Sequence, residues 1–166
     1  IRCDISVFGY DMDNMKPRNW YESFMPGYRL KGENQDVFFD NIKKYIELSE
    51  NIALNTRLAI KKAWFNRPSD KRGSMDFVDS AFYGRTEATF YQLMQNIVDG
   101  CRDENLTIIE ECREKWIDCL KKISLDLFDE YALSGPFENE KPKNIVKSKK
   151  ALQSFNEKKM SQFQAK

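Results

Sequence analysis

The stretch TIIEECREKWIDCLKKISLDL, residues 107–127, decides the fold. Its apolar residues recur every three or four positions, the spacing that places side chains on one face of an α-helix. That face comprises Ile109, Cys112, Trp116, Cys119, Leu120, Ile123 and Leu127. Thr107 and Glu110 fit a capping box, in which the two side chains satisfy free amides at a helix start. The pattern predicts a helix from Thr107 to about residue 133, where Ser134-Gly135-Pro136 follows.

Three further stretches have the same helical period. They cover residues 36–66, residues 74–98 and residues 142–163. Proline after Arg67 ends the first, Gly100 is expected to stop the second, and Pro142 suits the first turn of the third. Residues in phase with each stripe are predicted to be buried: Ile42, Ile52, Phe90, Leu93, Trp116, Leu120, Ile123 and Leu152. Four amphipathic helices with short connections predict an all-α fold, an antiparallel four-helix bundle over residues 35–166.

Residues 1–34 have a different pattern. Ile1, Cys3, Ile5 and Val7 alternate with polar residues, as in a half-buried strand, and a turn-rich octet over residues 11–18 follows. A two-stranded hairpin alone is marginal in water. We therefore expect a short β segment here, joined to a larger α/β region that precedes Ile1, and interpret the chain as a piece of a longer protein.

Histidine is absent from all 166 residues, and this excludes several classes of enzyme. Ser-His-Asp and Cys-His nucleophilic sites need it, as do small helical nucleases that pair arginine with histidine. Neither of the common glycine-rich phosphate-binding loops is present. The sequence predicts no catalytic residue, no metal site, no cofactor and no enzymatic activity.

The four cysteines and the hydropathy of the chain indicate in which cellular compartment it works. Cys3, Cys101, Cys112 and Cys119 show no C-x-x-C spacing, so we interpret them as small hydrophobic residues of a reduced core. A metal or redox site is the alternative. No apolar run approaches the roughly 20 residues that span a bilayer. A cytoplasmic protein without membrane contact is therefore expected.

Charge is distributed unevenly, although the formal net charge is only +1. Residues 57–72 carry six bases against one acid, and residues 141–166 carry eight lysines against Glu157. Residues 99–130 carry ten acids against five bases. Basic stripes of this kind can follow the phosphates of a nucleic acid. The candidate phosphate-binding residues are Lys61, Lys62, Arg67, Lys143, Lys147, Lys150 and Lys158.

Two alternatives to this interpretation stay open. Every amphipathic helix needs a solvated face, and lysine supplies one without any ligand. Trp64-Phe65, among basic residues, could instead offer a stacking platform for bases. The basic residues of 141–166 are all lysine, so contact there would neutralise charge without reading sequence.

Several segments resemble the CasA family, the large subunits of type I-E CRISPR Cascade, an RNA-guided DNA surveillance complex. Residues 9–16, with Arg18 and residues 20–22, resemble the segment that leads into the C-terminal bundle of that family. Residues 81–91 resemble its second bundle helix, and residues 120–152 its last two helices. The resemblance implies that the chain is the C-terminal part of such a subunit.

The resemblance also implies a function. In this family the large subunit recognises a protospacer-adjacent motif, and a small loop wedges the duplex open beside it. The matching positions here are Asp13, Asn14, Met15 and Lys16. Met15 would act as an apolar insert between base steps, as minor-groove wedges often do. An ordinary hairpin turn is the alternative interpretation of the same residues.

The partners implied by the resemblance are other Cascade protein subunits, the CRISPR guide RNA complex and double-stranded target DNA. The bundle would then help to hold the opened DNA and perform no chemistry itself. The alternative is a protein–protein interaction bundle without direct nucleic-acid contact, in which the lysines dock an acidic partner.

Overall fold

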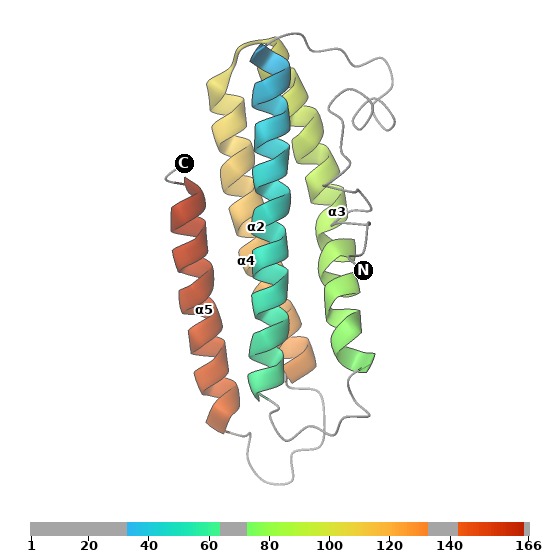
Figure 1. Ribbon diagram of the computed structural model, residues 1–166, viewed down its shortest axis with the longest axis vertical. Helices are drawn as coiled ribbons and strands as arrows, with labels where there is room; N and C mark the ends of the chain where they lie inside the picture. Colours follow the sequence, from blue (N-terminus) through green and yellow to red (C-terminus); the bar gives the residue numbers. More distant parts are fainter. Residues whose placement is uncertain (1–32, 64–72, 133–142, 165–166) are drawn as a thin grey trace.

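Four long helices make up the part of the chain that the computed structural model describes, residues 33–63, 73–132 and 143–164 (Figure 1). They are α2, Glu33–Ala63, α3, Gly73–Arg102, α4, Leu106–Ala132, and α5, Lys143–Gln164. Successive helices run in opposite directions, and α2 contacts each of the other three. The predicted antiparallel four-helix bundle is confirmed. The predicted β segment and the boundary at residue 34 are not tested, since residues 1–32 lie outside the described part.

The predicted core is confirmed with one exception. Seven of the eight residues expected to be buried are buried, Trp116 and Leu120 completely. Ile123 is only partly buried, so its prediction was wrong. In this half of α4 the face turned toward the core includes Ser124 and Phe128, which leaves Ile123 at its edge.

An aromatic cluster joins all four helices. Trp116 of α4 stacks on Tyr45 of α2, with ring centroids 5.9 Å apart and planes 8° apart. Phe90 of α3 lies 5.8 Å from the Trp116 ring, and Phe163 of α5 meets the edge of Tyr45 at 5.6 Å. Because each ring comes from a different helix, the cluster fixes the relative positions of the helices by packing.

A polar layer separates this larger core from a second apolar cluster, which lies toward the end of the bundle where α2 ends and α5 begins. Thr56 of α2 and Ser124 of α4 share a hydrogen bond of 2.7 Å. The Asn156 side chain of α5 donates to the Ser124 hydroxyl at 3.0 Å. Thr56 also donates to the Ile52 carbonyl at 2.7 Å. Since that bond uses the Thr56 hydrogen, Ser124 donates to Thr56, and three helices are linked by one chain of hydrogen bonds.

The connection between α3 and α4 corrects two predictions. Gly100 does not stop α3, which continues to Arg102. The stop is made by Glu104, whose φ of 53° is left-handed, and by the Asn105 amide, which donates to the Gly100 carbonyl at 2.9 Å. A bond of this span around a left-handed residue is one of the two bonds that define a Schellman motif. Gly100 instead lies in close contact with the start of α4, where an added Cβ would be 3.2 Å from a side-chain carbon of Ile109 and 3.3 Å from the Asn105 carbonyl oxygen.

The cap of α4 is also shifted from its predicted position. The side-chain oxygen of Asn105 accepts hydrogen bonds from the amides of Thr107, at 3.1 Å, and Ile108, at 3.4 Å. Asn105 therefore caps the helix, and Thr107 already lies inside it. Asparagine is as good a cap as threonine, and the left-handed turn that ends α3 places Asn105 where the next helix begins.

Candidate functional site

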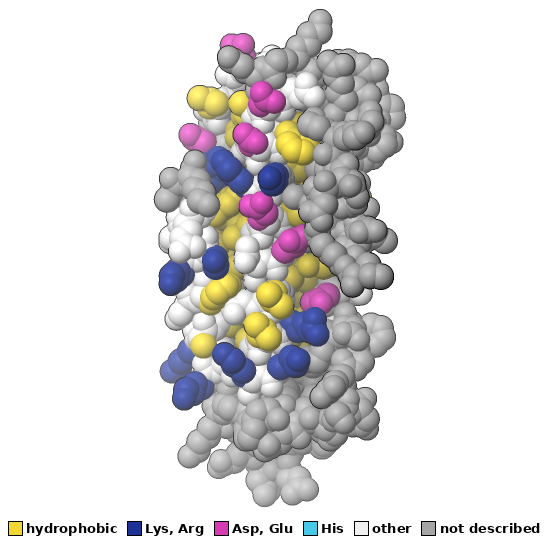
Figure 2. All heavy atoms as spheres, viewed as in Figure 1, with side chains coloured by type: hydrophobic (Ala, Val, Ile, Leu, Met, Phe, Trp, Pro, Cys, Tyr) yellow, Lys and Arg dark blue, Asp and Glu magenta, His cyan; other side chains and the backbone are white. Residues whose placement is uncertain are grey.

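Positive charge gathers toward one end of the bundle. On the face shown in Figure 2, most lysine and arginine side chains lie in the lower half and most carboxylates lie above them. The lower half contains the last turn of α2, with Lys61 and Lys62, and the first turns of α5. Because α2 and α5 are antiparallel neighbours, two basic segments far apart in the sequence meet at this end.

Five exposed lysines form a surface that we call the lysine face. Its members are Lys61, Lys62, Lys147, Lys150 and Lys158. Four of them, Lys61, Lys147, Lys150 and Lys158, form no ion pair with any residue of the described helices. Helical spacing spreads the three α5 members along the outer side of that helix, opposite the buried Ile145 and Leu152.

Other basic residues nearby are already engaged. Lys149 pairs with Asp129 of α4 at 2.7 Å, and Lys121 of α4 pairs with Glu157 of α5 at 2.7 Å. Lys159 lies over the Phe155 ring, 5.6 Å from its centroid. The two ion pairs join α5 to α4, and the contact of Lys159 with Phe155 lies within α5. Among the α5 lysines whose side chains the structure describes, Lys147, Lys150 and Lys158 are therefore the ones left to meet a ligand.

Helix ends add to the positive field. The first turn of α5 contains no acidic residue, and the helix begins with Lys143. Cations at a helix N-terminus oppose the macrodipole, at a cost of about 0.3–1 kcal/mol each. Lysines in the first turns of α5 do not therefore stabilise the helix electrostatically. Together with the helix N-terminus, they make this end attractive to anions.

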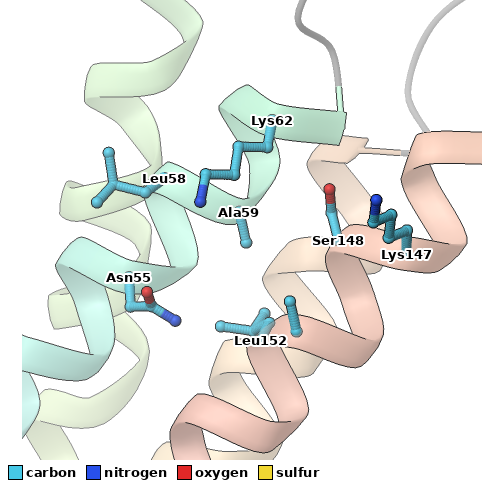
Figure 3. Close-up of a pocket in the computed structure, with 8 residues that line it drawn as sticks. Asn55, Leu58, Ala59, Lys62, Lys147, Ser148 and Leu152 are labelled. Atoms are coloured by element: carbon cyan, nitrogen blue, oxygen red, sulfur yellow. The ribbon is translucent and has the colours of Figure 1, made fainter.

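A groove lies between α2 and α5, with a volume of about 340 Å³. We call it the α2–α5 groove; it is lined by Asn55, Leu58, Ala59, Lys62, Lys147, Ser148, Ala151 and Leu152. Asn55 and Leu152 point toward one another across it (Figure 3). The groove was not predicted, because it forms between segments of the chain almost ninety residues apart. Small residues on facing helices, Ala59 and Ser148, were the only available signal.

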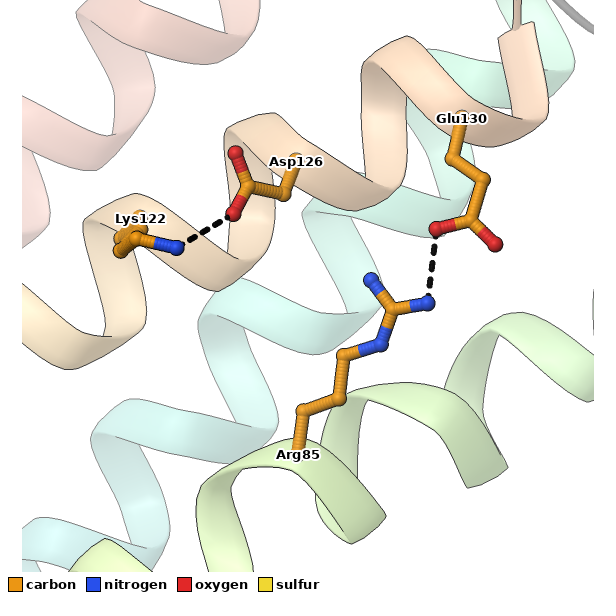
Figure 4. Close-up of polar contacts among 4 residues, drawn as sticks. All are labelled: Arg85, Lys122, Asp126 and Glu130. Carbon is orange, nitrogen blue, oxygen red and sulfur yellow. Dashed lines mark hydrogen bonds and ion pairs between the residues drawn. The ribbon is translucent and has the colours of Figure 1, made fainter.

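The acidic segment, residues 99–130, is partly neutralised on the bundle surface. Arg85 of α3 donates to Glu130 of α4 at 2.7 Å, and Lys122 pairs with Asp126 of the next turn at 2.9 Å (Figure 4). These pairs are exposed, so each adds little stability. Arg57 and Asp79 form a further pair between α2 and α3 at 3.4 Å.

The three cysteines of the described helices lie in or against the apolar core. Cys101 and Cys112 are buried in the larger core, and Cys119 is half-buried against it. Burial raises the pKa of Cys101 to about 11 and also raises the pKa values of Cys112 and Cys119. Within the described residues no group of three or more Cys, Asp or Glu side chains is arranged to hold a metal ion. None of the described helices combines the length and apolarity needed to cross a membrane.

Several candidate residues are not placed by the structure. Arg67, Trp64-Phe65 and the candidate wedge at residues 13–16 lie outside the described residues. Lys143 opens α5, but its side chain is not described. Five of the seven candidate phosphate-binding residues are therefore placed, and all five are exposed; their contact with phosphate stays a prediction.

Comparison with known proteins identifies a family. Residues 2–127 match the model of the family described as CRISPR-associated protein Cse1. The match spans more than half of the chain and includes α2, α3 and most of α4, whereas α5 lies beyond it. No curated protein and no solved structure matches the chain.

Proposed function

Because the chain belongs to the Cse1 family of CRISPR-associated proteins, also called CasA, we propose that it helps a Cascade complex to open and hold target DNA. The family gives the chain a role in CRISPR Cascade, alongside other protein subunits. In this proposal the lysine face holds the phosphate backbone, and residues 13–16 wedge the duplex open beside the protospacer-adjacent motif. The chain itself performs no chemistry.

One observation carries the backbone contact. Lys61, Lys147, Lys150 and Lys158 are exposed and form no ion pair with a described residue, although neighbouring lysines do. A lysine that has no ion-pair partner among the described residues keeps its hydration and its counterions until an anion binds. Phosphates that displace those counterions gain affinity through counterion release. Target DNA is the polyanion that a Cascade subunit meets.

The chemistry of the lysine face favours binding of the DNA backbone over recognition of the base sequence. Lysine offers a mobile point charge, whereas sequence recognition uses the planar, bidentate arginine side chain. Each lysine would therefore neutralise one phosphate whatever the base beside it. Such contacts position a duplex or a displaced strand while specificity comes from guide RNA pairing.

The wedge rests on the resemblance of residues 9–16 to the CasA family. Asn14 and Met15 would enter the minor groove at the first base pair beside the motif. That groove presents a degenerate pattern, so a short amide and a thioether distinguish little beyond its shape and A·T from G·C. Their role is therefore mechanical: they hold the strands apart while guide pairing begins.

The same proposal fixes partners and compartment. The chain would work beside the guide RNA complex and double-stranded target DNA, in the cytoplasm where invading DNA is met. Neither a metal nor a cofactor takes part in the proposed steps. Type I-E Cascade is the assembly to which the resemblance points.

The test compares two pairs of exposed lysines. Lys150→Ala with Lys158→Ala removes two charges from the lysine face, and Lys43→Ala with Lys115→Ala removes two exposed charges elsewhere. The first pair should weaken duplex binding by the assembled complex equally for all DNA sequences, and the second should not. If both pairs weaken binding to the same extent, overall charge explains the affinity and the lysine face does not.

A further inference from the structure

The α2–α5 groove has a chemistry that DNA binding does not explain. Its polar lining groups include one lysine from each wall, Lys62 and Lys147, and no carboxylate is among the lining residues. Its remaining surface is largely apolar and includes Ala59, Ala151 and Leu152. A phosphate backbone would use the lysines and leave this apolar surface in contact with water.

An exposed apolar ridge continues from the groove along α2. Leu58 lines the groove and is 43% exposed, and Leu54, one turn earlier on the same helix, is 55% exposed. Leucines four residues apart lie on the same side of a helix. Isolated exposed apolar residues are ordinary, but here two leucines adjoin an apolar groove that is flanked by cations.

We propose that the α2–α5 groove, with Leu54 and Leu58, docks an acidic amphipathic helix of another protein. Apolar residues of the partner at i, i+3 or i+4 and i+7 would cover the two leucines and enter the groove. Carboxylates beside that stripe would pair with Lys147 and lie near Lys62, which already interacts with another group of the chain. The positive charge of the lysines favours a negatively charged partner, and burial of the apolar groove surface supplies most of the affinity.

The groove also offers specific polar contacts. The Asn55 side chain points across the groove toward Leu152 of α5, and Ser148 lines the opposite wall (Figure 3). An amide and a hydroxyl can each bond to a carboxylate or a backbone group. These groups would orient a docked helix in a way that lysines alone, as mobile point charges, do not.

The α2–α5 groove shares Lys62 and Lys147 with the lysine face, but the two proposals have separate tests. Lys150 and Lys158, which test the DNA contact, do not line the groove. Loss of the effect expected at Lys150 and Lys158 would therefore leave the docking proposal intact. The partner is a protein helix, and nucleic acid in the groove is an outcome that the experiment detects.

The probe is a fluorescein-labelled synthetic peptide that forms a helix with a leucine stripe flanked by glutamates. A second peptide of the same composition has its leucines distributed around the helix. Fluorescence anisotropy with the 166-residue chain should show binding of the first peptide, and binding of the second that is weaker by about tenfold or more. Equal binding of the two peptides would mean that lysines capture any polyanion, and would overturn the proposal.

Groove variants locate the binding. Ala151→Trp fills the groove without changing charge, and Gln153→Trp adds the same ring at an exposed α5 position outside the lining. The first should weaken peptide binding by about tenfold, and the second should leave it unchanged. Leu58→Ser tests the apolar wall if Ala151→Trp disturbs the fold, which thermal unfolding reports. Equal effects of the two tryptophans, or loss of duplex DNA binding with Ala151→Trp alone, would contradict a protein-docking groove.

Discussion

The indole N–H of Trp116 donates a hydrogen bond to the main-chain carbonyl oxygen of Tyr45, 3.0 Å away, while the two rings stack. Both residues are completely buried, so this bond links α4 to α2 inside the core. A buried tryptophan needs a partner for its N–H, and here a helix carbonyl supplies it. The contact explains how the largest core side chain is accommodated without an unsatisfied polar atom.

Trp116→Ala should lower the free energy of unfolding by about 3–5 kcal/mol, since it removes a ring that touches α2 and α3. Trp116→Phe keeps part of the ring and loses the hydrogen bond, which is worth about 1 kcal/mol in addition to the lost volume. Urea unfolding followed by circular dichroism measures both. A cost below 1 kcal/mol for the alanine variant would show that the aromatic cluster does not stabilise the bundle.

The polar layer predicts non-additive mutations. Ser124→Ala should cost about 1–3 kcal/mol, because the buried Asn156 amide loses its acceptor. Asn156 already has a buried side-chain oxygen without a hydrogen-bond partner among the described residues. Replacing all three polar residues, as Thr56→Val, Ser124→Ala and Asn156→Leu, should recover most of that stability. The same unfolding assay applies, and a triple variant less stable than Ser124→Ala would refute this account of the layer.

The raised pKa values of the cysteines predict both slow alkylation and sensitivity to alkali. Burial raises the pKa of Cys101 from an ordinary 9.0 to about 11, so its thiolate is scarce at neutral pH. Iodoacetamide should modify Cys101 and Cys112 much faster after unfolding than before, in a Cys3→Ser variant that lacks the thiol outside the described residues. Because the pKa is higher in the folded state, the contribution of Cys101 to stability should be constant below pH 9 and fall as pH rises toward 11. Fast labelling of folded Cys101 would contradict its burial.

The wedge predicts a result that depends on the state of the DNA. Asn14→Ala with Met15→Gly should slow opening of a fully paired target by the assembled complex. The same variant should matter much less on a target already melted beside the motif, because no base pair is left to separate. Fluorescence of a 2-aminopurine placed at the first base pair follows the opening. Equal loss on both targets would indicate a defect in binding or folding.

The core and the bundle were accessible to sequence reasoning because burial follows the helical period. Trp116 and Leu120 lie at the centre of a stripe, where the period alone determines burial. Ile123 lies where the buried face turns within α4, and that turn depends on how the helices pack. The period carries no information about such packing.

The helix ends and the α2–α5 groove depend on contacts between segments, which the helical period of apolar residues does not predict. Thr107 and Asn105 are both good cap residues, and the choice between them was made by the left-handed Glu104 just before. The α2–α5 groove requires Ala59 and Ser148 to face each other across two helices. Lys147, Lys150 and Lys158 are exposed, as their position opposite the apolar stripe of α5 predicts. The ion pair of Lys149 with Asp129 depends on how α5 packs against α4, which the helical period does not give.

Salt dependence tests the proposed DNA contact most directly. The logarithm of the affinity for duplex DNA, plotted against the logarithm of salt concentration, has a slope set by the number of phosphates neutralised. In the assembled complex, Lys150→Ala with Lys158→Ala should flatten that slope by about one unit for each lost contact. Lys43→Ala with Lys115→Ala should leave it unchanged. A slope that stays the same for Lys150→Ala with Lys158→Ala would contradict the account and reduce these lysines to a solvated helix surface.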